Sequence, residues 1–217
     1  MNVVFIGPPG AGKGVQAELL SKSHGLVALS TGGILRQAVS NRTPVGIRAR
    51  AAMDAGRLVD DETMIGVVAE RLDSPDIRNG FILDGFPRTV AQAEALDDLL
   101  AERELPLTAA LELRVPDETL IRRITGRFAC ADCGQGYHDD FRKPVKDGVC
   151  DQCGGSRFTR RSDDNRETAA ARLQAYHAET ASILPYYRHA GKLKTLNGEG
   201  SVAEVAALIT AALPARA

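Results

Sequence analysis

The chain has 217 residues, of which 44% are hydrophobic and 25% charged, and these values are ordinary for a globular protein with one main core. The formal net charge of −1 excludes a global field that would attract nucleic acid or a membrane surface. No apolar run reaches the length of a membrane helix, and no secretory signal is present, so we expect a cytoplasmic protein that contacts neither membrane nor nucleic acid.

Short apolar runs alternate with helical stretches along the chain. Residues 2–6 show no alternation of polar and apolar side chains, which predicts a strand buried on both faces of a parallel sheet. We expect further strands at 27–29, 81–84, 107–115 and 193–196, and helices at 15–24, 62–72, 90–102, 117–124, 165–187 and 202–213. This order predicts an α/β fold in which helices flank a doubly wound, five-stranded parallel sheet.

Two stretches depart from this alternation. The first insert, 30–59, is charged, contains five arginines and has few large apolar residues, so we expect a small helical excursion outside the central core. Ser30 or Thr31 is placed to cap its opening helix. The second insert, 126–163, is rich in turn-forming and polar residues and contains all four cysteines of the chain.

Residues 7–13 read Gly-Pro-Pro-Gly-Ala-Gly-Lys, between the first predicted strand and a helix. This is the G-x-x-x-x-G-K pattern of a phosphate loop, in which glycines turn backbone N–H groups around a phosphate and the lysine adds a positive charge. The helix N-terminus contributes the positive end of its dipole. The alternative is a Gly/Pro turn that binds nothing, and the strand, the lysine and the helix together favour a phosphate site.

The residue after the lysine is Gly14, where many phosphate loops carry a Ser or Thr whose hydroxyl holds Mg²⁺. We therefore expect the metal to be held another way, through water and Asp84. The Gly-Lys-Gly variant itself is typical of nucleoside monophosphate kinases.

The sequence Asp-Gly-Phe-Pro-Arg-Thr at 84–89, taken with the phosphate loop, makes the chain resemble the adenylate kinases in their long form. The resemblance extends over nearly the whole chain, with each motif in the expected order. It also includes Ser-Thr-Gly at 30–32, Gln92, Arg-Ile-Thr-Gly-Arg at 123–127, Arg-Ser-Asp-Asp at 161–164 and Arg172.

This resemblance implies a phosphate-loop nucleoside kinase fold with two mobile flaps on a core. The core would comprise 1–29, 60–125 and 164–217, the first insert (30–59) would be an AMP-binding domain, and the second insert (126–163) would be a lid. It further implies a monomeric, Mg²⁺-dependent enzyme that converts ATP and AMP into two ADP.

The same resemblance implies roles for individual residues. ATP would be bound by Gly10, Ala11, Gly12, Lys13, Gly14, Val15, Arg123, Arg127, Tyr137 and His138. AMP would be bound by Thr31, Arg36, Arg57, Gly85, Arg88, Gln92, Arg161 and Arg172. Lys13, Arg88, Arg127, Arg161 and Arg172 would surround the transferred phosphates, Asp84 would anchor waters around Mg²⁺, and Asp163 and Asp164 would help to close the lid.

General chemistry agrees with these implied roles. The attacking oxygen of AMP is already an anion, so no general base is required, and catalysis reduces to alignment and charge neutralisation. Arginine suits this work because its planar fork meets phosphate oxygens in pairs. Flaps that close over both substrates would exclude water, the competing acceptor.

The chain departs from the family pattern at Val15, where a threonine is usual. A hydroxyl that could bond a phosphate is missing. We expect weaker nucleotide binding, by about 1 kcal/mol for one such bond.

The cysteines form two C-x-x-C pairs, Cys130 with Cys133 and Cys150 with Cys153. This spacing is typical of a four-thiolate zinc site with a structural role, because four cysteines leave no open position for a substrate. Iron or a pair of disulfides are the alternatives, and a cytosolic chain disfavours disulfides. His138 lies in the same insert, but four cysteines already complete the coordination shell.

Two other functions fit parts of the sequence. A kinase for UMP or CMP would share almost all of this chemistry, and Thr31 and Gln92 favour AMP only by resemblance. A zinc-ribbon protein that binds nucleic acid is the second alternative. The acids around the cysteines oppose it, because they would repel a phosphate backbone.

Overall fold

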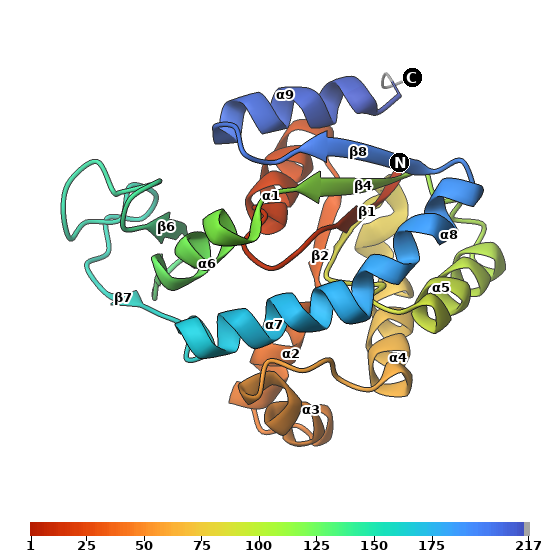
Figure 1. Ribbon diagram of the computed structural model, residues 1–217, viewed down its shortest axis with the longest axis horizontal. Helices are drawn as coiled ribbons and strands as arrows, with labels where there is room; N and C mark the ends of the chain where they lie inside the picture. The colour runs from red at the N-terminus through yellow and green to blue at the C-terminus, as the bar shows by residue number, and fades with distance from the viewer. Residues whose placement is uncertain (215–217) are drawn as a thin grey trace.

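The computed structural model describes residues 1–214. Its core is a parallel sheet of five strands in the order β2-β3-β1-β4-β8 (Figure 1), which confirms the predicted doubly wound sheet. The strands are β1 (Asn2–Ile6), β2 (Val27–Ser30), β3 (Phe81–Asp84), β4 (Ala109–Arg114) and β8 (Leu193–Asn197).

The central strand β1 is buried along its whole length. Val4 and Ile6 face one apolar layer, whereas Val3 and Phe5 face the other, because successive side chains of a strand point to opposite faces. Helices cover both faces, so nearly every β1 side chain must be apolar. This is why the run lacks polar alternation.

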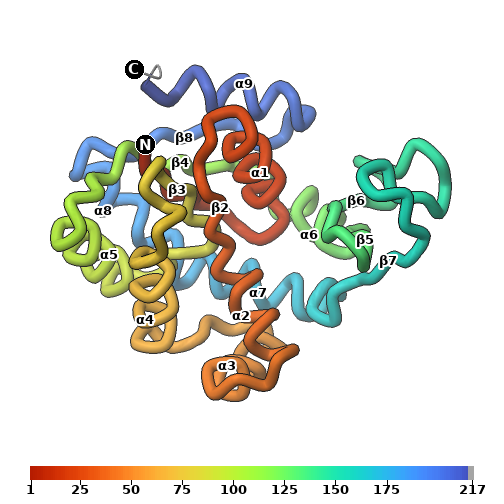
Figure 2. Tube along the Cα trace, turned by 180° about the vertical axis from the view of Figure 1, so that it is seen from behind, coloured from red at the N-terminus to blue at the C-terminus, as the bar shows by residue number. Residues whose placement is uncertain are grey.

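One face of the sheet carries α1 (Lys13–His24) and α9 (Val202–Ala212), and the other carries α4 (Asp61–Leu72), α5 (Val90–Glu102) and α8 (Ile183–His189) (Figures 1 and 2). A short 3-10 helix, η1 (Pro75–Asn79), precedes β3, and α6 (Asp117–Thr125) follows β4. Among residues 1–214, no helix combines the length and apolar character that a membrane crossing requires.

The first insert folds as α2 (Thr31–Ser40) and α3 (Pro44–Asp54), at the bottom of the view in Figure 1. Ser30 caps α2, and its side chain accepts a hydrogen bond from the N–H of Gly33. The expectation that this insert lies outside the core is only partly right. Leu35, Ala49 and Val59 are buried in the main apolar cluster, because α2 packs against α4 and β3, and α3 packs against α2.

The predicted helix 165–187 is wrong as a single element. The structure has α7 (Arg166–Ala178), a 3-10 turn η2 (Thr180–Ser182) and then α8. Pro185 lies in the first turn of α8, where its missing N–H is harmless, whereas a continuous helix would need that donor. The pattern of apolar residues did not reveal this break.

The second insert forms a separate three-stranded antiparallel sheet, β6-β5-β7, which projects from the ends of α6 and α7 (Figure 1). Its strands are β5 (Arg127–Cys130), β6 (Gly136–His138) and β7 (Phe158–Thr159). Phe128, Tyr137 and Phe158 pack together beneath the cysteines, with ring centroids 5.5–5.7 Å apart. Three rings form too small a core to hold such an insert unaided.

Candidate active site

The loop between β1 and α1 has a backbone shape that favours glycine. Gly10 and Gly12 have φ values of 85° and 91°, where other residues are strained. A Cβ on Gly10 would lie 2.9 Å from the carbonyl oxygen of Leu120 in α6. Gly12 caps α1 without a side-chain hydrogen bond, so the N–H groups of the first turn can bind an anion.

Lys13, the first residue of α1, folds back over this loop. Its Nζ donates hydrogen bonds to the carbonyl oxygens of Gly7 at 2.6 Å and Pro8 at 2.9 Å. Burial lowers the pKa of Lys13 to about 8, the carboxylate of Asp84 opposes that shift, and nearby arginines such as Arg88 add to it. A phosphate beside Nζ would favour the charged amine again.

Asp84 ends β3, directly beside Phe5 of β1 in the register of the sheet. A Cβ on Gly14 would lie 3.5 Å from Asp84 Oδ2, so this carboxylate faces the first turn of α1. One carboxylate next to a phosphate loop fits Mg²⁺, which takes one or two carboxylates, substrate phosphates and several waters.

Five arginines with predicted phosphate roles converge near Lys13. Burial lowers the pKa of four of them, Arg36, Arg88, Arg161 and Arg172, and repulsion from neighbouring arginines lowers each of these pKa values further. The pKa of Arg161 falls to about 10. With Lys13 they make six cations against three nearby carboxylates. Such an excess of positive charge, most of it on half-buried side chains, is typical of a polyphosphate site. The arginines are Arg36 of α2, Arg88 after β3, Arg127 of β5, Arg161 before α7 and Arg172 of α7.

Two of those carboxylates tie the second insert to α7. Asp164 accepts two hydrogen bonds from Arg127, and its side chain is only 1% exposed. Asp163 accepts one from Arg172 at 2.9 Å. Both predicted lid-closing acids therefore contact predicted phosphate-binding arginines.

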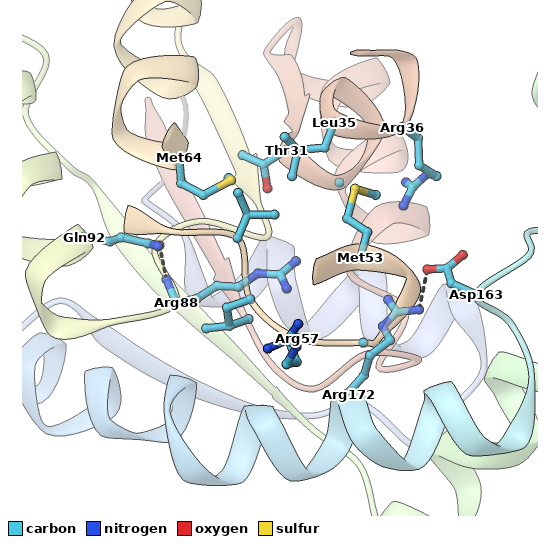
Figure 3. Close-up of a pocket in the computed structure, with 14 residues that line it drawn as sticks. Thr31, Leu35, Arg36, Met53, Arg57, Met64, Arg88, Gln92, Asp163 and Arg172 are labelled. Carbon is cyan, nitrogen blue, oxygen red and sulfur yellow. Dashed lines mark hydrogen bonds and ion pairs between the residues drawn. The ribbon is translucent and has the colours of Figure 1, made fainter. Parts of the chain in front are cut away.

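A pocket opens beside this cluster, between the first insert, α4 and α7 (Figure 3). One part of its wall is apolar and another part is cationic. This division suits a ligand with a flat ring at one end and an anion at the other. The apolar side chains are Leu35, Met53, Leu58, Val59 and Met64, and the charged ones are Arg36, Arg57, Arg88, Arg172 and Asp163.

Six of the eight predicted AMP residues line this pocket, namely Thr31, Arg36, Arg57, Arg88, Gln92 and Arg172. Gly85 and Arg161 are not among the residues that line it. The backbone N–H of Arg88 donates to Gln92 Oε1 at 2.8 Å (Figure 3), and Arg88 Nε donates to the carbonyl oxygen of Gly85 at 2.7 Å. Thr31 Oγ1 donates to the carbonyl oxygen of Asp84 at 3.2 Å. A Cβ on Gly85 would lie 2.8 Å from Thr31 Oγ1, so glycine allows this close approach.

Arg123 lies at the far end of the phosphate loop, on α6. Its guanidinium donates to the carbonyl oxygens of Gly198 and Glu199, and burial lowers its pKa. The ring of Phe141 lies 5.9 Å from it and is 52% exposed. Arg122 lies closer to the same ring, at 5.0 Å from its centroid.

The side chains of Tyr137 and His138 hydrogen-bond to groups of the second insert and of α6. The Tyr137 ring is buried, and its hydroxyl donates to Cys150 Sγ and accepts from the N–H of Asp151. His138 Nδ1 accepts from the N–H groups of Asp140 and Phe141, so Nε2 carries the proton and faces the carbonyl oxygen of Arg122 at 3.2 Å. Tyr137 thus supports the interior of the second insert, whereas His138 also joins the insert to α6. Their predicted contacts with ATP stay predictions.

Ala11 and Val15 complete the predicted ATP set. Ala11 is buried, and its N–H donates to the carbonyl oxygen of Pro8 within the loop. Val15 lies half-buried in the first turn of α1, one residue beyond Gly14. Its side chain has no hydroxyl to offer a phosphate.

The four cysteines lie close together at the end of the second insert. Their sulfur atoms are all within 4.8 Å of one another, with Cys130 Sγ 3.6 Å from Cys153 Sγ and Cys133 Sγ 3.5 Å from Cys150 Sγ. All four are free thiols, so the disulfide alternative is not the state of this structure. Four sulfurs at these separations fit a tetrahedral ion with metal–sulfur distances near 2.3 Å.

Comparisons with known proteins place this site in one family. The family model described as adenylate kinase matches residues 5–192. An adenylate kinase from Paramagnetospirillum magneticum is 55% identical over 205 residues, covering 94% of each chain. One from Allorhizobium ampelinum is 52% identical over 98% of this chain and 99% of its own, and one from Novosphingobium aromaticivorans is 49% identical over the full length of both. The chain therefore belongs to the adenylate kinase family.

Proposed function

We propose that the protein transfers the terminal phosphoryl group of ATP to AMP, with Mg²⁺, and releases two ADP. The observation that carries this proposal is the pocket at Gln92, which shares Arg36, Arg88 and Arg172 with the arginine cluster around Lys13. Two nucleotides bound at these places would meet with their phosphates between them. The family relationship supports the same reaction.

In this mechanism the γ-phosphorus–oxygen bond of ATP breaks as a phosphate oxygen of AMP bonds to the same phosphorus. That oxygen is already an anion, so no side chain has to remove a proton. Arg88 and Arg36 hold the AMP phosphate, while Lys13 and the first turn of α1 hold those of ATP. Preorganised cations stabilise the charge that spreads over the equatorial oxygens, and this is the main source of rate.

The second insert would act as a lid. Arg127 and Arg161 belong to it, so closing the lid completes the cationic cage and excludes water. Asp84 would hold Mg²⁺ through its waters, and the bound ion would neutralise phosphate charge. The thiolates of Cys130, Cys133, Cys150 and Cys153 would hold one structural zinc ion. From the family resemblance we also propose that the enzyme works as a cytoplasmic monomer.

The direct test is to mix the protein with ATP, Mg²⁺ and AMP and to quantify ADP. We expect two ADP molecules for each ATP consumed. When AMP is omitted, we expect ADP to form much more slowly. The same assay with UMP and CMP tests the closest alternative. If turnover is faster with UMP or CMP than with AMP, that pyrimidine nucleotide is the acceptor. If no phosphoryl transfer to any of the three monophosphates is detected, the proposal is overturned.

A further inference from the structure

The side-chain amide of Gln92 is held in one orientation at the pocket wall. Gln92 is 1% exposed and sits in the first turn of α5. Its Oε1 accepts the N–H of Arg88 at 2.8 Å, and its Nε2 donates to Asp61 Oδ1 at 2.7 Å. The backbone N–H can only donate and the carboxylate can only accept, so chemistry alone assigns which end is oxygen.

Asp61 is the anchor of this arrangement. It is the first residue of α4, 31 positions from Gln92 in sequence, and does not line the pocket. Its second oxygen, Oδ2, accepts the hydroxyl proton of Thr89 at 3.0 Å. Thr89 in turn caps α5 by accepting the N–H of Gln92 at 3.2 Å. The Asp61 carboxylate therefore holds both the Gln92 amide and Thr89, the residue that caps α5, the helix that carries Gln92.

We propose that Asp61 determines the base preference of the monophosphate site by preventing rotation of the Gln92 amide, an inference that rests on the proposed function. When Gln92 is bonded to both Arg88 and Asp61, its Oε1 still has one free lone pair and its Nε2 still has one free hydrogen. The amide thus presents an acceptor beside a donor. Adenine has the complementary edge, the 6-amino donor beside the N1 acceptor.

A 6-oxopurine has the opposite edge, because O6 accepts and N1–H donates. A glutamine free to turn by 180° could serve either base. Here rotation would place an NH₂ group against the N–H of Arg88 and the amide oxygen against the Asp61 carboxylate. Two favourable hydrogen bonds would become two repulsive contacts. Rejection of the wrong base is strongest when a fixed polar group is left unpaired.

AMP and IMP are the sharpest pair of probes, since they differ only at this edge. We expect the wild-type ratio of kcat/KM for AMP to that for IMP to be high. The isosteric substitution Asp61→Asn replaces the carboxylate by an amide that can turn together with Gln92, so that only the bond to Arg88 opposes rotation. We expect it to lower the AMP-to-IMP ratio by about tenfold or more, partly through a gain in activity with IMP. Asp61→Ala should lower the ratio in the same direction.

The matched control is Asp60→Asn. Asp60 is the neighbouring acid and caps α4 by accepting the N–H of Thr63 at 2.8 Å, without contact to Gln92. Asparagine also caps helices well, so this variant removes the same charge and should keep the wild-type ratio. Circular dichroism and thermal melting of every variant show whether it is folded.

The outcomes separate the two proposals. A wild-type protein that makes no ADP from ATP and AMP would defeat the proposed function before any variant is compared. If the wild-type protein is active but the AMP-to-IMP ratio is unchanged in Asp61→Asn and Asp61→Ala, the proposed role of Asp61 is overturned and the proposed function is not. An equal loss of activity with both nucleotides would also overturn it, because a merely structural residue affects both bases alike. Binding of AMP and IMP by calorimetry gives a readout independent of turnover.

Discussion

Arg127 of β5 binds Asp164 through two hydrogen bonds, Nε to Oδ2 at 2.7 Å and Nη2 to Oδ1 at 2.5 Å. This pair joins the first strand of the second insert to the segment that leads into α7. Arg127 is also one of the arginines that we propose to bind phosphate, so in this structure a carboxylate occupies a group that phosphate would bind. The second insert, which we propose to be a lid, is therefore held by contacts for which substrate phosphates would compete.

Asp164→Asn should destabilise the protein in the absence of nucleotide by about 1–3 kcal/mol, because a buried charged hydrogen-bond partner is lost and Arg127 stays among other cations. ATP and AMP together should recover part of this loss, since their phosphates replace the missing anion. Urea unfolding with and without nucleotides measures both effects. The control is Asp139→Asn, whose exposed pair with Arg160 should contribute within about 1 kcal/mol. Equal effects of the two variants would remove the special role of Asp164.

Lys13→Met should reduce kcat by roughly 10²–10³-fold, the loss typical when one preorganised donor to the developing charge is removed. The side chain of methionine has similar length and leaves the loop glycines intact. Lys22→Met is the comparison, because Lys22 lies on the same helix in an exposed pair with Glu18, and it should retain full activity. A Lys13→Met enzyme with wild-type kcat would show that the loop backbone alone holds the transferred phosphate.

ATP affinity should depend on pH because the pKa of Lys13 is lowered to about 8. Below that value Lys13 is already charged, and affinity should be flat. As pH rises through 8 the free protein loses this proton, whereas the ATP complex keeps it, so affinity should fall and binding should take up protons. Calorimetry at pH 8.5 in buffers of different ionisation enthalpy measures the uptake. Lys13→Met should abolish most of it, and uptake that persists in that variant would assign it to another group.

The sequence predicted the sheet well because most of its strands are short, apolar and bounded by turn residues, and only the edge strand β8 is polar at three of its five positions. The 107–115 prediction for β4 was too long, since Leu107 is buried without being part of the strand. Burial and strand pairing leave the same apolar signature in a sequence. The break between α7 and α8 was likewise hidden, and only Pro185 marked it.

At the site, the predicted residues were those encoded in contiguous motifs. Asp61 was missed because its role arises from a contact with Gln92 across the fold, and nothing in its own neighbourhood indicates that contact. Tyr137 was assigned to ATP by family pattern, and the hydrogen bonds of its hydroxyl to Cys150 Sγ and the N–H of Asp151 could not be predicted from that pattern. A motif thus identifies which residues matter without showing which way each side chain points.

Val15→Thr tests the departure from the family pattern. Val15 lies one residue beyond Gly14 in the first turn of α1, where N–H groups can face a phosphate. A threonine hydroxyl there could donate one further hydrogen bond, and we expect ATP to bind about 1 kcal/mol more tightly, or roughly fivefold. Val15→Ala controls for the change in packing. Unchanged ATP affinity in the threonine variant, measured by calorimetry, would contradict the prediction.

Metal removal should loosen the second insert before it affects the core. The insert has only a three-ring apolar cluster, so a structural ion would supply much of its stability. We expect metal analysis to find one zinc per chain. Chelation should expose the insert to limited proteolysis and lower the melting temperature, while the circular dichroism of the core helices persists at low temperature.

Cys150→Ser should reproduce the chelated state without chelator, because one of the four thiolates is lost. Tyr137 reports on it directly, since its hydroxyl donates to Cys150 Sγ and accepts from the N–H of Asp151, and its fluorescence should change as the ring becomes exposed. Ser156→Ala, in the same insert but outside the cysteine cluster, is the control and should behave as wild type. Identical melting of the metal-loaded, chelated and Cys150→Ser proteins would show that the cysteines do not hold the insert together through a metal.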